Sequence, residues 1–176
     1  NTDEYDNIKS VVNDYLKEGI AHTLDETRNL SDSGQFEDIS LQQGIRQILY
    51  PYEEMEVLNP EWEVILKDII DSLFEQMSDE EYNILNEEFG TYMVSRAYEY
   101  RQLLEYLVFR YFAKSIYDYD FLGKCQMLVT NFFVIRQMDI IRWLDNHREY
   151  SFKDRMDVVH IFSRQVEYSE DNIENL

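Results

Sequence analysis

The chain has 176 residues, of which 44% are hydrophobic and 15% aromatic, enough to form the core of one ordinary domain. The single cysteine, Cys125, excludes an internal disulfide framework and a metal site with several thiolate ligands within this chain. The net charge of −20 lies mainly in residues 1–90, which hold 23 Asp and Glu against 5 Lys and Arg; residues 91–176 are close to neutral, with a net charge of −2.

This acidic first half repels phosphate backbones, so nucleic acid is not expected as a partner. It is expected either to attract a basic or lysine-bearing protein surface or to be a solvated face that keeps the protein soluble. No apolar run approaches the ~18 residues of a membrane span, and no signal peptide opens the chain. The expected location is the cytoplasm.

Helical patterns begin in residues 7–24, where apolar side chains recur three or four positions apart. A polar stretch at residues 25–38, with one glycine, predicts a loop. Ser40 and Gln43 then form a capping box that predicts a helix over residues 41–58. Pro51 is expected to kink or end that helix near Tyr50.

The next helices also have clear start signals. Asn59 before Pro60 is an N-cap followed by proline at the first helical position, which predicts a helix through residue 77. Ser78 and Glu81 form a second capping box for a helix over residues 79–90, which Gly90 is expected to end or bend.

Residues 91–117 and 121–146 are apolar nearly all the way round, which predicts two helices at the centre of a bundle. Ser151 and Asp154 predict the start of a last helix over residues 152–168. Because glycine and proline are few, β-rich folds are disfavoured. The chain is therefore predicted to be one all-α domain, residues 1–176, forming a single bundle of six to seven helices.

Charged residues interrupt both predicted central helices: Arg96, Glu99, Arg101, Glu105 and Arg110 in the first, and Arg136, Asp139 and Arg142 in the second. Spacing predicts that Arg101 pairs with Glu105 and that Asp139 pairs with its two arginine neighbours. Buried charges must be paired or line a polar cavity. A structural network between helices and a substrate pocket both remain possible from the sequence.

Histidine is scarce, and Asp157 with His160 makes one D-x-x-H pair on a helix. A di-iron bundle needs two E-x-x-H motifs and further carboxylates, so a metal-containing helical oxidase is a weak third hypothesis. We expect no metal site in this chain, and His160 is predicted to be a hydrogen-bonded interior or boundary residue. The many tyrosines are expected at the rim of the core, with each hydroxyl hydrogen-bonded.

The C-terminal part resembles the flagellin lysine N-methylase family. The resemblance rests on "EYRQLLEYLVFRYFAKSIYDYD", "FFVIRQMDIIRWLDN" and the closing segment "FSRQVEYSEDNIENL". That segment is similar to a family pattern in which Tyr is usual at the place of Phe162 and Glu at the place of Gln165. The pattern's charged places are filled by Arg164 and Glu167, which lie three residues apart on one side of a helix. They are expected to pair locally or to face another domain.

The resemblance implies methyl transfer to lysine side chains of flagellin, with S-adenosylmethionine as methyl donor and an iron–sulfur cluster bound by cysteines near the N-terminus of the parent protein. One cysteine cannot form that cluster, and the chain begins at Asn1. We therefore expect the C-terminal fragment of a longer protein, a substrate-recognition or scaffold part that is inactive without its cysteine-rich N-terminal part. The alternative is a non-enzymatic helical ligand-binding or dimerisation domain of a bacterial regulator.

Overall fold

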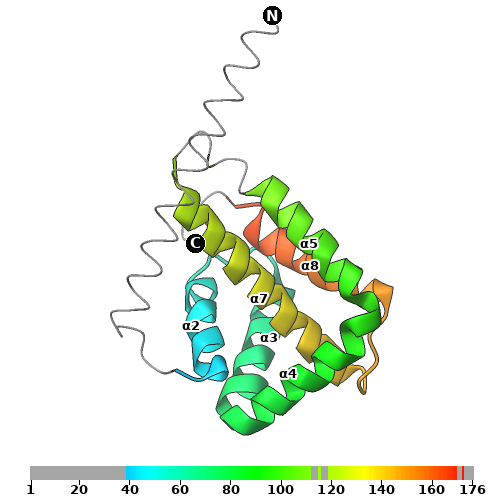
Figure 1. Cartoon of the computed structure of the whole chain (residues 1–176). Helices are drawn as coiled ribbons and strands as arrows, with labels where there is room; N and C mark the ends of the chain where they lie inside the picture. Colours follow the sequence, from blue (N-terminus) through cyan, green and yellow to red (C-terminus); the bar gives the residue numbers. More distant parts are fainter. Residues whose placement is uncertain (1–38, 112–114, 116–118, 170–171, 173–176) are drawn as a thin grey trace, which may run out of the picture.

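The computed structural model describes residues 39–111, 115, 119–169 and 172, and within them the chain is all-α with no strand (Figure 1). In the part of the chain that the structure describes, five continuous helical segments have defined bounds: α2 (Leu41–Glu53); α3 (Pro60–Ile69) with the π-helical Ile70–Glu75; α4 (Asp79–Met93), the 3-10 turn Val94–Arg96 and α5 (Ala97–Arg110); α7 (Phe121–Asp145); and α8 (Phe152–Val166). The all-α prediction is confirmed. The helix predicted over residues 7–24 and the loop after it lie outside the described residues.

The predicted helix starts are confirmed. Capping boxes form at Ser40, Ser78 and Ser151, where each serine hydroxyl accepts a hydrogen bond from the backbone N–H three residues later. The Asn59 side chain accepts a hydrogen bond from the backbone N–H of Glu61 at 3.2 Å. These contacts satisfy N–H groups that the first turn of a helix leaves without partners.

Two predicted helix ends lie three residues too early. The first helix does not end near Tyr50 but continues past Pro51 to Glu53, and Tyr52 is buried against Trp62. Because proline lies in the last turn, little of the helix depends on the hydrogen bond that it removes. Gly90 does not end α4 either, which continues to Met93 before the 3-10 turn.

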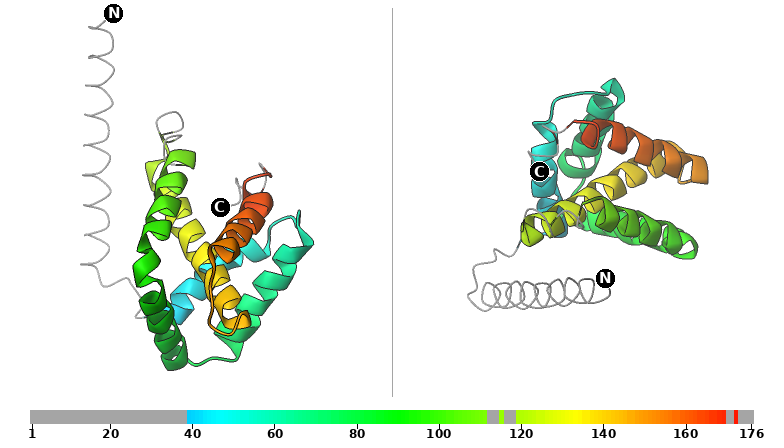
Figure 2. Two further views of the ribbon diagram at one scale, coloured as in Figure 1. Left: turned by 90° about the vertical axis from the view of Figure 1, so that its right-hand side faces the viewer. Right: turned by 90° about the horizontal axis from the view of Figure 1, so that it is seen from above.

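The prediction of two central helices holds for α7 and is wrong for α5. α7 runs through the middle of the bundle and contacts α2, α3, α5 and α8 (Figure 1). In both views of Figure 2, α4 and α5 lie along one outer edge of the described bundle. On α5, Tyr98 is 56% exposed and Phe109 is 83% exposed. The aromatic residues that make α5 resemble a central helix thus lie partly on its outer surface.

The core joins helices that are far apart in the sequence. Tyr52 of α2, Trp62 of α3 and Phe162 of α8 form a cluster with ring centroids 6.2–6.5 Å apart. A second cluster places Phe89 and Tyr92 of α4 against Trp143 of α7. The two clusters pack α8 and the C-terminal end of α7 against their neighbours. Both helices contribute polar groups to the network described next. None of the described helices is long and apolar enough to cross a lipid bilayer.

Candidate functional site

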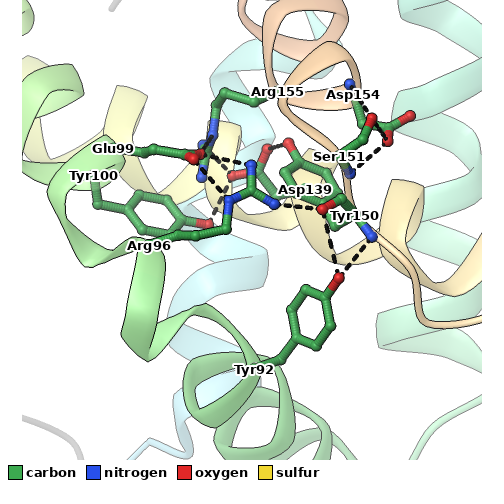
Figure 3. Close-up of polar contacts among 9 residues, drawn as sticks. All are labelled: Tyr92, Arg96, Glu99, Tyr100, Asp139, Tyr150, Ser151, Asp154 and Arg155. Carbon is green, nitrogen blue, oxygen red and sulfur yellow. Dashed lines mark hydrogen bonds and ion pairs between the residues drawn. The ribbon is translucent and has the colours of Figure 1, made fainter.

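A buried carboxylate lies where three helices meet. Asp139 of α7 has no exposed surface and accepts hydrogen bonds from Arg155 of α8, with Nη1 2.5 Å from Oδ2, and from the hydroxyl of Tyr100 of α5 at 2.7 Å (Figure 3). Its second oxygen accepts a hydrogen bond from the hydroxyl of Tyr150, just before α8. Three donors from three segments thus surround one negative charge, which is what a buried carboxylate needs.

A second carboxylate extends this network toward α4. Glu99 of α5 is buried and lies between Arg155, with Nε 3.4 Å from Oε2, and Arg96, with Nε 2.7 Å from Oε1. Arg96 also donates to the backbone carbonyl of Tyr150, whose N–H donates to the Tyr92 hydroxyl at 2.9 Å (Figure 3). Two arginines and two carboxylates make the network neutral as a whole, with Arg96 at its partly exposed end.

The electrostatics of the network follow from its burial. Burial raises the pKa of the Asp139 carboxyl, and the charge of Arg155 with the two tyrosine hydroxyls offsets part of that rise. Burial and the nearby Asp139 charge raise the pKa of both Tyr100 and Tyr150, so both hydroxyls stay protonated as donors. The Arg155 guanidinium carbon also lies 4.2 Å from the centroid of the Tyr100 ring. The arrangement is suited to holding α5, α7 and α8 together.

The predicted partners of Asp139 are wrong. Arg136 turns away and donates to the side-chain and backbone oxygens of Asn86 on α4, with its guanidinium over the Phe89 ring. Arg142 is half-buried, and its positive charge acts on Asp154, where it helps to lower the pKa of the carboxyl. Although partial burial opposes it, hydrogen bonds from Ser151 lower the pKa of Asp154. Interactions between helices therefore outweigh the three-residue spacing within α7.

Three other candidate residues, Arg101, Glu105 and His160, lie on the surface. Arg101 and Glu105 form the predicted pair at 2.9 Å, but both side chains are more than half exposed. His160 is exposed, so its prediction as an interior or boundary residue is wrong. Among the described residues, no group of three or more His, Cys, Asp or Glu is placed to hold a metal ion.

The closing segment fixes the loop between α2 and α3. Gln165, fully buried, accepts hydrogen bonds from the backbone N–H groups of Leu58 and Asn59 and donates to the Glu56 carbonyl at 2.6 Å. Asn172, 1% exposed, accepts from the Glu56 N–H and donates to the carbonyls of Glu56 and Gln165. Two polar residues of "FSRQVEYSEDN", Gln165 and Asn172, thus satisfy buried backbone groups.

Arg164 and Glu167 of this segment do not pair with each other. Glu167 accepts hydrogen bonds from the hydroxyls of Tyr106, Tyr111 and Ser163 and lies 3.9 Å from the Arg110 side chain. Burial, together with the hydrogen bond to Glu167, raises the pKa of Tyr106 to about 12. Arg164 is exposed and has no ion-pair partner among the described residues, so the expected local pairing is wrong.

We expect Glu167→Ala to lower the free energy of unfolding by about 1–3 kcal/mol, because the Tyr111 hydroxyl, in a side chain only 1% exposed, loses its acceptor. Urea denaturation followed by circular dichroism measures this change. Arg164→Ala, on the exposed side of the same helix, is the control and is expected to change stability by less than about 0.5 kcal/mol. Equal effects of the two substitutions would contradict this role for Glu167.

Sequence reasoning missed Arg155, Tyr100 and Tyr150, although they complete the network. The sequence did show that Arg155 is the fourth residue of a capped helix. Residue spacing along that helix does not reveal, however, that the Arg155 side chain is buried. Sequence reasoning did single out Gln165 as a place in the family pattern without giving it a role. The expected hydrogen bonds form at buried tyrosines such as Tyr52, which donates to Asn131 at 2.6 Å. The prediction is wrong for the exposed Tyr50, Tyr98 and Tyr168, whose hydroxyls make no hydrogen bond within the described residues.

Carboxylates dominate the surface of α3 and α4. Twelve exposed Asp and Glu side chains lie in residues 53–88, whereas residues 39–90 contain two basic residues. One of these, Arg46, pairs with Glu53; the other, Lys67, is exposed. We call the surface formed by these twelve side chains of residues 53–88 the acidic surface. It lies in the part of the acidic first half that the structure describes.

Comparison with known proteins identifies the family. The family model for the FliB lysine N-methylase C-terminal domain matches residues 1–176, the whole chain. No curated protein and no solved structure gave a significant match. The chain belongs to the family of FliB lysine N-methylase C-terminal domains.

Proposed function

We propose that this domain recognises flagellin, the lysine-bearing substrate, for a lysine N-methylase. Two observations support the proposal: the family match, and an acidic surface on which exposed carboxylates far outnumber exposed basic side chains. The family match also favours this function over a regulatory ligand-binding domain. The acidic surface is the single observation in the structure that carries the proposal.

The physical reason is long-range attraction. A surface of one sign raises the local concentration of an oppositely charged partner and accelerates encounter by roughly 10–1,000-fold at low ionic strength. Such attraction acts on the association rate more than on the final affinity, and salt screens it. A domain that gathers lysine-bearing protein segments needs this property, whereas a purely structural domain does not.

The iron–sulfur cluster that the family resemblance implies does not fit the residues of this chain. The whole sequence has one cysteine, Cys125, which is half-buried with a pKa raised by burial. The described residues also lack a cluster of metal-binding side chains. We therefore assign no step of methyl transfer to this chain and place its role in binding.

We expect flagellin to bind the purified chain in about 20 mM salt and to bind much more weakly in about 500 mM salt, because the screening length falls severalfold over this range. Surface plasmon resonance with immobilised flagellin measures both association and dissociation rates. No binding at low salt would remove substrate recognition and leave a scaffold role. Binding that is independent of salt would show that the acidic surface does not mediate it.

A further inference from the structure

A second surface feature lies where α4 meets the end of α7. An open groove of about 510 Å³ is lined by Ile84, Glu87, Glu88, Thr91 and Tyr92 of α4, by Trp143 of α7 and by Arg148 of the following loop. Its walls thus combine two large aromatic rings with two carboxylates. Aromatic faces and carboxylates together favour a cation.

The groove already holds a cation from this chain. The Arg148 guanidinium carbon lies 5.1 Å from the centroid of the Trp143 ring, and Nη1 lies 2.8 Å from Oε2 of Glu88. Glu87, also exposed, has no ion-pair partner among the described residues. One arginine therefore shows how a positive side chain fits the groove, and one carboxylate stays available to a second.

The aromatic wall is rigid. Trp143 is only 3% exposed and packs against Phe89 and Tyr92, with ring centroids 5.4 and 5.6 Å away. The Tyr92 hydroxyl is fixed by the backbone N–H of Tyr150. A rigid wall loses little conformational entropy when a ligand binds.

The Arg148 side chain is held much more weakly than this wall. Its backbone is fixed by an N–H donated to the Trp143 carbonyl at 2.7 Å and lies in the left-handed region, with φ of 69°. The side chain itself is 56% exposed and is held by one surface ion pair and one ring contact. Contacts of this kind are weak, so a competing cation can displace the guanidinium without unfolding the loop.

We propose that this groove binds the ammonium group of a substrate lysine, which replaces the Arg148 guanidinium over Trp143 and beside Glu88, with Glu87 at the groove wall. That the groove accepts a cation is inferred from its own contacts. That the cation is a lysine of the substrate protein rests on the proposed function. In this arrangement the acidic surface attracts the substrate protein, and the groove then holds one of its lysine side chains.

The probe is Nα-acetyl-lysine methylamide at millimolar concentration, with the uncharged norleucine analogue as the matched ligand. Nuclear magnetic resonance of the two tryptophan indole N–H groups gives the readout. Trp62, 2% exposed and part of the other aromatic cluster, is an internal control. We expect the lysine probe to shift the Trp143 signal with little change at Trp62, and the norleucine probe to shift neither. Equal responses of the two tryptophans, or to the two probes, would overturn the proposal.

Two pairs of variants test the exchange of cations. Arg148→Ala removes the resident cation and is expected to tighten probe binding about fivefold, whereas Glu88→Gln is expected to weaken it about threefold. Arg101→Ala and Glu105→Gln alter an exposed ion pair on α5 and are the matched controls, expected to leave binding unchanged. If Arg148→Ala binds the probe no better than Arg101→Ala, the proposal is wrong.

The failure of this inference is distinguishable from the failure of the proposed function. Flagellin binding by the chain with no response of Trp143 to lysine would overturn the groove and leave substrate recognition intact. A response of Trp143 without any flagellin binding would support the cation site and overturn the substrate protein as its source.

Discussion

Replacing Arg155 by methionine is expected to lower the free energy of unfolding by about 3–5 kcal/mol, one of the largest effects of any single substitution in this domain. Arg155 is 4% exposed and Asp139 has no exposed surface, so removing the guanidinium leaves a negative charge buried with two hydroxyl donors only. Glu99 at the same time loses one of its two arginine partners. Urea denaturation followed by circular dichroism measures the change.

The stability of the same variant is expected to depend on pH, and the pKa of Asp139 sets the direction of that dependence. Burial already raises the pKa of Asp139, and removing the offsetting Arg155 charge raises it further. A carboxyl whose folded pKa exceeds its unfolded value near 3.9 binds a proton more tightly in the folded state. The folded state therefore loses stability as the pH rises from the unfolded pKa to the folded pKa. The difference between wild type and Arg155→Met should therefore shrink when the pH is lowered from 8 to 5.

Two comparisons make this prediction specific. Arg101→Met removes an exposed ion pair and is expected to cost less than about 0.5 kcal/mol. Adding Asp139→Leu to Arg155→Met removes the unpaired buried charge and should restore part of the lost stability. A loss under 1 kcal/mol for Arg155→Met, or no recovery in the double variant, would contradict the structural role of the network.

Gln165→Ala is expected to lower the free energy of unfolding by about 2–4 kcal/mol. Gln165 is fully buried, and its removal leaves the backbone N–H groups of Leu58 and Asn59 without acceptors. Each unsatisfied buried group costs about 1–3 kcal/mol. The Glu56 carbonyl keeps a donor from Asn172, which limits the loss. Thermal and urea denaturation both measure the effect.

The control at this position uses the residue that is usual in the family pattern. Gln165→Glu keeps an acceptor for the two N–H groups, and as the protonated acid it also keeps a donor to the Glu56 carbonyl, so at pH 5 it is expected to destabilise less than alanine. At pH 8 the buried carboxylate would have no positive partner, and the loss of stability is expected to be larger. Arg164→Ala, one residue earlier and exposed, should have almost no effect. If Gln165→Ala and Gln165→Glu were equally destabilising at pH 5, the hydrogen bonds accepted from the two N–H groups would not explain the polar side chain.

Local signals in the sequence predicted the starts of the described helices because a helix cap is a contact over three residues. Ser40, Ser78 and Ser151 each needed only their own first turn to be recognised. Pro51 and Gly90 were less informative because burial of their neighbours, such as Tyr52 and Phe89, keeps the helix intact. Tertiary packing overrides weak local preferences at such places.

The buried network was not predictable in detail because its partners come from different helices. Asp139 has arginines three residues away on both sides, yet its donor is Arg155 of the following helix. Spacing describes contacts within one helix and says nothing of which face meets a neighbour. The exposed outer face of α5 was missed for the same reason, since tyrosine and phenylalanine occur both in cores and at partly exposed positions.

Substrate recognition by the acidic surface is tested most directly by two variants that each neutralise three carboxylates, one on the acidic surface and one outside it. Glu61, Asp68 and Glu75 lie exposed along α3 and its π-helical continuation, and Glu105, Asp145 and Glu149 lie exposed outside the acidic surface. Each set is converted to the amides, which changes the net charge equally. The measurement is the rate of association with flagellin at about 20 mM salt. We predict a rate about threefold slower for the first variant and nearly unchanged for the second. Equal rates for both variants would contradict the proposal.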